Sequence, residues 1–334
     1  MAAPSKMGSV EPGAPDVTLA MAVADRSQLT ERQRAAQERR LAKRAAALAK
    51  VVAADAAEPI ALGSSWLAAW RLAFYVGLTL PLMPVQLLLV SLGSGGAARL
   101  PLFYHRLCCR IFGFDIRVIG EISTRRPTLY VCNHTSYLDI PVLGSILPAS
   151  FVAKTEVASW PGFGLLAKLQ RTVFVDRRRG TSHQQREQLQ ERLDAGDNLI
   201  LFPEGTSNDG NRVLPFRSAL LSVAEARPHG QPLTVQPVSI SYVGLNGLPL
   251  GHGLRPLLAW YGDMTLGGHL WTFCRLGRVR VVVEFHPVTD VTAFPSRKEL
   301  TRYCLDRVAD GVSRAIAGLT GALSPVQSGT VKKD

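Results

Sequence analysis

Cysteine is scarce in this sequence, and its spacing excludes the usual zinc sites. Five cysteines occur among 334 residues, an odd number with no C-x-x-C pair, and most of them fall in apolar runs. No G-x-S-x-G elbow occurs, so the usual mark of a serine hydrolase on an α/β fold is missing. These absences indicate a reducing compartment and a chain without a metal site.

Acidic residues are also few compared with basic ones. The chain has 26 Asp and Glu against 38 Lys and Arg, a formal net charge of +12. Anionic partners are therefore expected, whether nucleic acid, a membrane surface or an anionic substrate. The basic, aromatic-rich pattern of an RNA-binding sheet is absent, so we expect no nucleic-acid partner. A non-catalytic binder of membranes or nucleic acid is kept as the alternative from a different class.

The N-terminal region lacks the basic segment that would begin a cleavable signal peptide. Residues 1–26 are rich in Ala, Pro, Gly and Ser and are predicted to be disordered. Residues 27–58 are predicted to form a basic, Ala-rich helix, because they contain strong helix formers and a T-E-R-Q capping box. This helix is expected either to lie on anionic lipid headgroups or to be simply solvated.

A long uncharged run follows, and it predicts a membrane-associating segment at residues 66–99. No charged residue falls between Arg71 and Arg99, and the run exceeds the roughly 20 apolar residues that span a bilayer. Pro81 and Pro84 interrupt it, so a straight single span is not guaranteed. A membrane-embedded or re-entrant helical hairpin is favoured over a soluble buried helix.

The remainder, residues 100–322, alternates apolar strands with helices, and a flexible tail is expected at 323–334. This order predicts an α/β fold with a mixed, mostly parallel sheet covered by helices. The chain is 47% hydrophobic, enough for a substantial core. Strands are predicted at residues 114–120, 128–133, 171–176, 198–203, 234–242 and 278–288, and helices at 183–196 and from 297 onward.

Two polar motifs follow predicted strands directly. N-H-T-S-Y-L-D places His134 five residues before Asp139. A neutral imidazole can accept a proton from an alcohol, and a carboxylate can hold its tautomer. Taken alone, Ser136 and Asp139 could instead cap the next helix, which is the commoner meaning of such residues.

The second motif, F-P-E-G-T at residues 202–206, ends another apolar strand. A Pro/Gly pair by itself indicates only a turn, but the full pentapeptide is rare by chance. A third candidate is Arg177, the first Arg after the strand in V-F-V-D-R. Its planar guanidinium could bind an anionic group at the sheet edge that carries the other two motifs.

Taken in order, N-H-x-x-x-x-D, V-F-V-D-R, F-P-E-G-T and V-Q-P-V resemble the four motif blocks of the glycerolipid acyltransferase family, whose best-known members are the 1-acylglycerol-3-phosphate acyltransferases. The resemblance implies that His134 deprotonates the free hydroxyl of a lysolipid, which then attacks an acyl thioester on coenzyme A or acyl carrier protein. Asp139 matches the orienting Asp. Arg177 and the trio Glu204, Gly205 and Thr206 match blocks implicated in holding the acceptor.

The resemblance further implies an enzyme on the cytoplasmic face of a membrane, in bacteria the inner membrane, with an anionic membrane surface as a partner. No tightly bound cofactor is expected, although magnesium could assist through substrate phosphate. The activated thioester needs no covalent Ser intermediate, so a hydrolase that uses Ser136 is the weaker alternative.

One departure concerns the acceptor. Many phosphatidic-acid-forming members have Arg after the third block, but this chain has Ser207. The first expectation is still 1-acyl-sn-glycerol-3-phosphate, with Arg212 or Arg217 replacing the missing guanidinium, and the alternative is a lyso-ornithine lipid. A second departure is Arg171, where many members have Gly.

Overall fold

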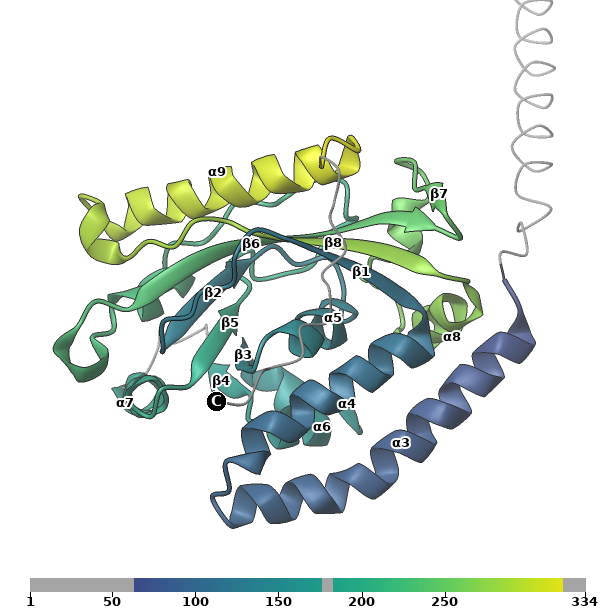
Figure 1. Ribbon diagram of the computed structural model, residues 1–334, viewed down its shortest axis with the longest axis horizontal. Coiled ribbons are helices and arrows are strands. Elements are labelled where there is room, and N and C mark those ends of the chain that lie inside the picture. The colour runs from purple at the N-terminus through teal and green to yellow at the C-terminus, as the bar shows by residue number, and fades with distance from the viewer. Residues whose placement is uncertain (1–62, 176–182, 321–334) are drawn as a thin grey trace, which may run out of the picture. The chain divides into compact units, whose positions relative to one another are not determined.

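The computed structural model describes residues 63–175 and 183–320 (Figure 1). The regions predicted at 1–26, 27–58 and 323–334 lie outside the described residues. Two long helices begin the described chain, α3 (Ser65–Ser91) and α4 (Gly96–Phe112). The strands are β1 (Phe114–Ile119), β2 (Thr128–Cys132), β3 (Ala149–Lys154), β4 (Val173–Val175), β5 (Asn198–Leu201), β6 (Thr234–Leu245), β7 (Leu248–Pro249) and β8 (Val279–Phe285). The α-helices that follow α4 are α5 (Asp139–Ile146), α6 (Phe163–Leu169), α7 (His183–Asp194), α8 (Leu266–Arg275) and α9 (Arg297–Ile316).

The strands form one mixed sheet in the order β1-β8-β6-β2-β5-β3-β4, with β7 paired to β6. All described pairs are parallel except β6 with β8 and β6 with β7. The predicted mostly parallel, helix-covered sheet is therefore confirmed. β2 and β5 are fully buried and lie side by side in the middle of the sheet, so the loops that follow them emerge at the same edge.

Two apolar clusters lie on the two faces of the sheet. One contains side chains of α4, α5 and α8 with Tyr130, Ile240 and Val283. The other contains side chains of α7 and α9 with Leu129, Val131 and Val235. Neighbouring residues of β2 therefore point to opposite faces, as strand geometry requires. Figure 1 shows α9 on one side of the sheet and α4 with α3 on the other.

The apolar run forms α3, which is continuous through Pro81 and Pro84 and bends along its length (Figure 1). It is long and apolar enough to cross a bilayer, and only 11% of its most apolar window is buried. Both of its ends are attached to the α/β domain. Near the start, Arg71 Nη1 donates to the Leu276 carbonyl over 2.6 Å. Near the end, Gln86 Nε2 donates to the Leu169 carbonyl over 2.8 Å.

Candidate active site

His134 and Asp139 meet at the carboxyl end of β2. The Nδ1 atom of His134 lies 2.8 Å from Oδ2 of Asp139, which is fully buried, while the His134 side chain is 23% exposed. The same oxygen accepts the backbone N–H groups of Thr135 at 2.8 Å and Ser136 at 3.0 Å. Nδ1 therefore carries the proton, and Nε2 keeps its lone pair on the more exposed side of the ring.

The structure does not show the helix cap that Ser136 or Asp139 could have supplied. The N-cap residue of α5 is Leu138, which has no side-chain cap hydrogen bond, and Asp139 bonds the imidazole and two N–H groups of the loop before the helix. Ser136 Oγ is buried and has no hydrogen-bond partner among residues 63–175 and 183–320. Because this hydroxyl forms no hydrogen bond with a ring nitrogen of His134, the geometry disfavours Ser136 as a nucleophile activated by His134.

The orientation of the imidazole is also determined by stacking. The ring of His134 lies on the ring of Phe202, with centroids 4.3 Å apart and planes 19° from parallel. Phe202 in turn stacks on Phe151 at 6.2 Å. Phe202, the first residue of the F-P-E-G-T motif, therefore supports the imidazole ring of His134.

Glu204 is bonded to the backbone of His134. Its Oε1 accepts the N–H of His134 at 2.8 Å, and its Oε2 accepts the N–H of Leu214 at 3.0 Å and the Asn208 side-chain amide at 2.8 Å. The side chain is buried, and burial raises the pKa of this carboxyl to about 7 even though these hydrogen bonds oppose the shift. The hydrogen bonds of Glu204 thus point into the protein and join the third block to the first.

The other predicted acceptor residues differ in position. Gly205 has a φ of 76°, which a residue with a side chain rarely adopts. Thr206 is exposed at the same edge of the sheet. Arg177 lies outside the described residues. Arg212 and Arg217, the suggested substitutes for the missing Arg, are both exposed.

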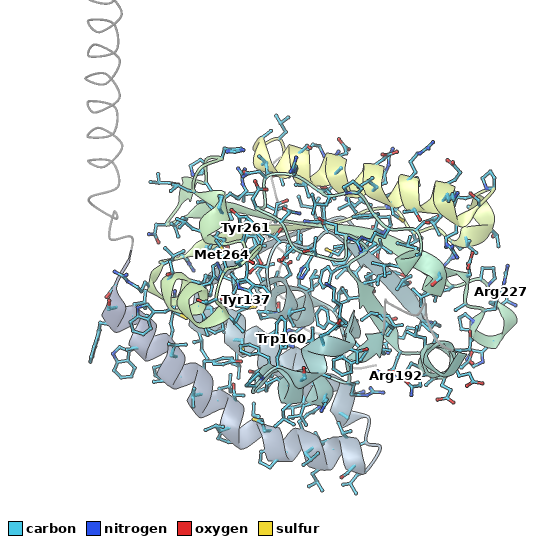
Figure 2. The ribbon with its side chains drawn as sticks, turned by 180° about the vertical axis from the view of Figure 1, so that it is seen from behind. Tyr137, Trp160, Arg192, Arg227, Tyr261 and Met264 are labelled. Carbon is cyan, nitrogen blue, oxygen red and sulfur yellow. The ribbon has the colours of Figure 1, made fainter. Side chains whose placement is uncertain are left out.

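Ser207 does not face the open edge. Its hydroxyl donates to the carbonyl of Trp260, and the Trp260 N–H donates to the Thr135 carbonyl over 3.1 Å. The loop after β7 is thereby attached to both motifs. The Trp260 indole packs edge-on against Trp160 at 5.6 Å and Tyr137 at 6.0 Å, and the latter two lie on the side of the protein shown in Figure 2.

The same loop contributes a buried cation. Arg255 is 4% exposed and donates to Oδ1 of Asn211 at 2.5 Å and to the Leu250 carbonyl at 2.8 Å. Its side chain packs close to Gly210, where an added Cβ would lie 3.3 Å from Arg255 Cγ and 3.1 Å from Thr135 Cγ2. The sequence analysis missed Trp260 and Arg255, because no local motif marks them and only the fold brings their loop to this edge.

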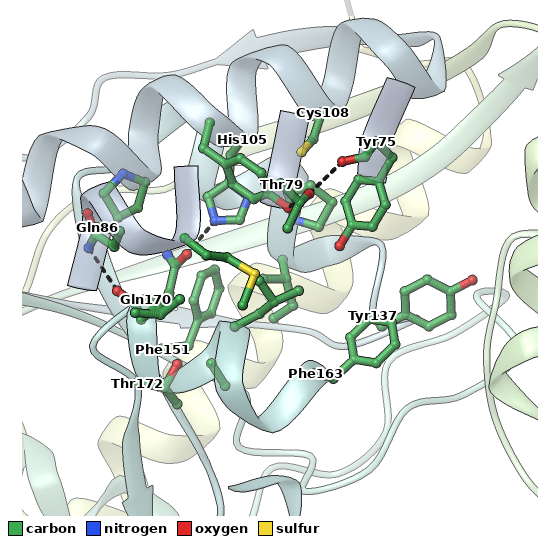
Figure 3. A pocket seen from close by; sticks show the side chains of 18 of the residues that line it. Tyr75, Thr79, Gln86, His105, Cys108, Tyr137, Phe151, Phe163, Gln170 and Thr172 are labelled. Atoms are coloured by element: carbon green, nitrogen blue, oxygen red, sulfur yellow. Dashed lines mark hydrogen bonds between the residues drawn. The ribbon is translucent and has the colours of Figure 1, made fainter. Parts of the chain in front are cut away.

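An apolar cavity of about 240 Å³ lies between α3, α4, α5 and α6 (Figure 3). Its wall includes Phe151 and Tyr137. Phe151 stacks on Phe202, which stacks on His134, so the cavity lies close to the imidazole. Two pairs of polar side chains in its wall are bonded to each other, Thr79 with Tyr104 at 2.9 Å and His105 with Gln170 at 2.5 Å. The amide of Gln86, also in the wall, donates to the backbone carbonyls of Ala97 and Leu169. Burial lowers the pKa of His105 to about 4, so the cavity wall is uncharged near neutral pH.

A metal site was not expected from the sequence. Within residues 63–175 and 183–320, no group of three or more His, Cys, Asp or Glu side chains could hold a metal ion.

Known proteins with similar sequences include several acyltransferases. The family model "Acyltransferase" matches residues 115–241. A lyso-ornithine lipid O-acyltransferase of Brucella abortus is 46% identical over 247 residues, covering 73% of this chain and 92% of that protein. One of Rhizobium meliloti is 42% identical over 248 residues, covering 73% and 85%.

Two further similar proteins are named for a different acceptor. A 1-acyl-sn-glycerol-3-phosphate acyltransferase of Neisseria gonorrhoeae is 27% identical over 235 residues, covering 68% of this chain and 80% of that protein. The crystal structure of the 1-acyl-sn-glycerophosphate acyltransferase PlsC from Thermotoga maritima shares the fold, with a TM-score of 0.50 and 24% identity over 68% of this chain and 81% of that one.

Proposed function

Because this chain belongs to the acyltransferase family and acylates lysolipids, we propose that it transfers a fatty acyl group from an acyl thioester to the hydroxyl of a lyso-ornithine lipid. The relatives that carry this name are 46% and 42% identical, against 27% for the glycerol-phosphate enzyme of Neisseria gonorrhoeae. The acceptor first expected from the sequence is therefore less well supported than its alternative. Family membership also makes this chain an enzyme, so the alternative of a non-catalytic binding protein is not retained.

The observation that carries the reaction is the His134–Asp139 contact. The acceptor hydroxyl gives its proton to Nε2 of His134 as its oxygen attacks the thioester carbonyl carbon. The tetrahedral intermediate then collapses, the carbon–sulfur bond breaks, and Nε2–H returns the proton to the leaving thiolate. The products are the acylated lipid and the free thiol of coenzyme A or the carrier protein.

Asp139 and Glu204 assist this cycle in different ways. Asp139 holds the Nδ1–H tautomer and stabilises the imidazolium that forms. Glu204 holds the backbone N–H of His134, so it acts on the acceptor site through the loop geometry. Thr206 and Arg177 remain the residues proposed to face the acceptor, with Gly205 allowing the turn between Glu204 and Thr206.

The uncharged cavity beside Phe151 suits the hydrocarbon chain of the acyl donor, either acyl-CoA or acyl-ACP. Ornithine is an amino acid, and its headgroup carries no phosphate. A magnesium requirement that acts through the acceptor is therefore not part of this proposal.

The membrane surface is the second partner. Large apolar side chains of α3 point outward, including Trp66 at 72% exposure, Leu80 at 61% and Leu87 at 59%. Monomeric soluble proteins rarely expose an apolar surface of this extent. With a net charge of +12 and a cytoplasmic acyl donor, we place the enzyme on the anionic cytoplasmic face of the membrane, in bacteria the inner membrane.

The decisive experiment supplies the purified full chain in lipid vesicles with labelled acyl donor and either lyso-ornithine lipid or 1-acyl-sn-glycerol-3-phosphate. We expect acylation of the ornithine lipid and a loss of about 10²–10⁴-fold in His134→Ala. His252→Ala, at an exposed His, is the control and should keep full activity. Near-normal turnover in His134→Ala would refute the mechanism, and a preference for the glycerol phosphate would refute the acceptor.

A further inference from the structure

Tyr242 lies behind the His134–Asp139 pair and has no role in any of the four motifs. It is on β6, the strand next to β2, and is 1% exposed. Its hydroxyl donates to Oδ1 of Asp139 over 2.8 Å, across 103 positions of sequence. From this contact we propose that Tyr242 is a positioning residue that acts on His134 through Asp139. The inference rests on the proposed role of His134 as the base.

The two carboxylate oxygens of Asp139 have different partners. Oδ2 accepts three N–H groups, from the His134 ring and from the backbone of Thr135 and Ser136. Oδ1 accepts the hydroxyl of Tyr242. A fully buried carboxylate with one oxygen unbonded is costly, and it can rotate to find another donor. The tyrosine removes that freedom and so keeps Oδ2 directed at the imidazole.

Tyr242 can act as a permanent donor. Burial, followed by the nearby Asp139 charge, raises the pKa of its hydroxyl well above the usual value, so the proton stays on the tyrosine. The thiols nearby are also neutral, because burial raises the pKa of Cys109 to about 12 and that of Cys132 well above its usual value. Of the groups that face Asp139 and Tyr242, only His134 changes charge during the cycle. Glu204 lies on the other side of His134, bonded to its backbone.

The consequence concerns the transition state. While His134 holds the acceptor proton, its positive charge is balanced by a carboxylate whose position depends on Tyr242. Removal of one hydrogen bond to a charged group corresponds to about a tenfold effect. We therefore expect a lower kcat and little change in KM for either substrate, since Tyr242 is buried behind the pair and reaches the site only through Asp139.

The test is Tyr242→Phe, which removes a single oxygen atom. We expect kcat to fall about tenfold, with KM for donor and acceptor within about twofold. The acid side of the pH–rate profile should move to lower pH, because a carboxylate that is free to turn away from the ring stabilises the imidazolium less. Tyr130→Phe is the matched control: Tyr130 is also 1% exposed and lies on adjacent β2, and no hydrogen bond among the described residues joins its hydroxyl to the pair.

A double-mutant cycle separates positioning from packing. In an Asp139→Asn background, the added Tyr242→Phe change should cost less than about twofold, because the two residues act in series. A further tenfold loss in that background, or an unchanged kcat and pH profile in Tyr242→Phe alone, would overturn the inference. If Tyr242→Phe does not fold, a fluorotyrosine placed at position 242 keeps the ring and makes its hydroxyl a stronger donor to Asp139. It should then shift the pH–rate profile, and an unchanged kcat and profile would overturn the inference. Activity in His134→Ala would instead refute the proposed function.

Discussion

Glu204 illustrates at the scale of single residues how a motif position acquires its role from the fold. The sequence marks it for acceptor binding, whereas the structure bonds its carboxylate to the backbone of His134 and Leu214. Burial is the largest influence on this group, and it raises the pKa from 4.5 to about 7. A carboxyl with a raised pKa binds its proton more tightly in the folded state than in the unfolded state.

This shift predicts a pH-dependent stability. The contribution of Glu204 is fully present below about pH 4.5 and is lost as the pH rises through about 7, where the buried carboxyl ionises. Relative to Glu204→Gln, the free energy of unfolding of the wild type should fall by about 2 kcal/mol between pH 5 and pH 8. Urea unfolding of both proteins at the two pH values measures the difference. Parallel pH profiles for the two proteins would show that Glu204 does not titrate in this range.

Arg171 stands where many family members have Gly, and its contacts show how an Arg is tolerated there. Its φ is 62°, in the left-handed region that favours Gly, while its Nη2 atom forms an ion pair with Asp197 at 2.8 Å. Arg192 joins the same carboxylate at 2.5 Å and also donates to the Arg171 carbonyl at 3.1 Å. The ion pair thus compensates for the backbone conformation.

Two substitutions at this position should differ. Arg171→Ala loses the ion pair but keeps the strained backbone, and should destabilise the protein by about 1 kcal/mol. Arg171→Gly loses the same pair but relieves the strain, so its stability should stay within about 0.5 kcal/mol of the wild type. Thermal unfolding of the three proteins measures this order. Equal destabilisation by Ala and Gly would show that the backbone conformation costs nothing.

At the scale of elements, the apolar run forms a single helix, α3, and does not fold back at Pro81 and Pro84; α3 forms a helical hairpin with the next helix, α4. Thr79 of α3 bonds to Tyr104 of α4 at 2.9 Å, and Gln86 donates to the Ala97 carbonyl at 2.9 Å. Pro81 and Pro84 are accommodated because a bent helix can follow its neighbours. The hairpin forms one wall of the cavity, so a segment expected only to bind membrane also shapes the proposed donor site.

The cavity predicts how acyl-chain preference can be changed. Ala167 of α6 lines it, and Leu165 of the same helix is 49% exposed. Ala167→Phe adds a ring to a space of about 240 Å³, so kcat/KM should drop at least about tenfold for long-chain donors and much less for short ones. Leu165→Phe is the matched control and should leave the preference unchanged. An equal loss for all chain lengths in Ala167→Phe would place the acyl chain elsewhere.

At the scale of the whole molecule, α3 touches one side of the α/β domain at both of its ends. Arg71 contacts the Leu276 and Gly277 carbonyls after α8, and Gln86 contacts the Leu169 carbonyl of α6. A helix that is bonded at both ends to one domain cannot place its ends on opposite sides of a bilayer while those bonds persist. We therefore propose that the outward apolar face of α3 enters the membrane from one side.

Thiol labelling tests this arrangement, because all five native cysteines of the chain are buried. Ser65→Cys and Ser91→Cys introduce exposed thiols at the first and last residues of α3. In sealed inverted membrane vesicles, an impermeant maleimide should label both positions from the cytoplasmic side, and neither in right-side-out vesicles. Labelling of the two positions from opposite sides would establish a spanning helix. Unlabelled wild type provides the background.

The parts of this protein that the sequence determined are those encoded locally. Alternating or continuous apolar runs predicted six of the strands, and the N-H-x-x-x-x-D and F-P-E-G-T motifs predicted the pair His134 and Asp139 and the third-block residues. β3 and β7 were missed, because β3 follows α5 after only two residues and β7 is a two-residue edge strand. β7 does follow a hairpin turn, Asn246-Gly247, but its two residues are too few to show an alternating pattern.

The tertiary structure decided the contacts that depend on the order of the strands in the sheet. Only the parallel pairing of β2 with both β5 and β6 brings Phe202 under the His134 ring, Glu204 to its backbone and Tyr242 to Asp139. In the sequence, Ser207 was notable only because many family members have Arg at this position. In the structure, its hydroxyl bonds to the Trp260 carbonyl and attaches that loop. These contacts join residues 53 to 103 positions apart. No local pattern encodes them, because side chains so distant in sequence meet only when the sheet is complete.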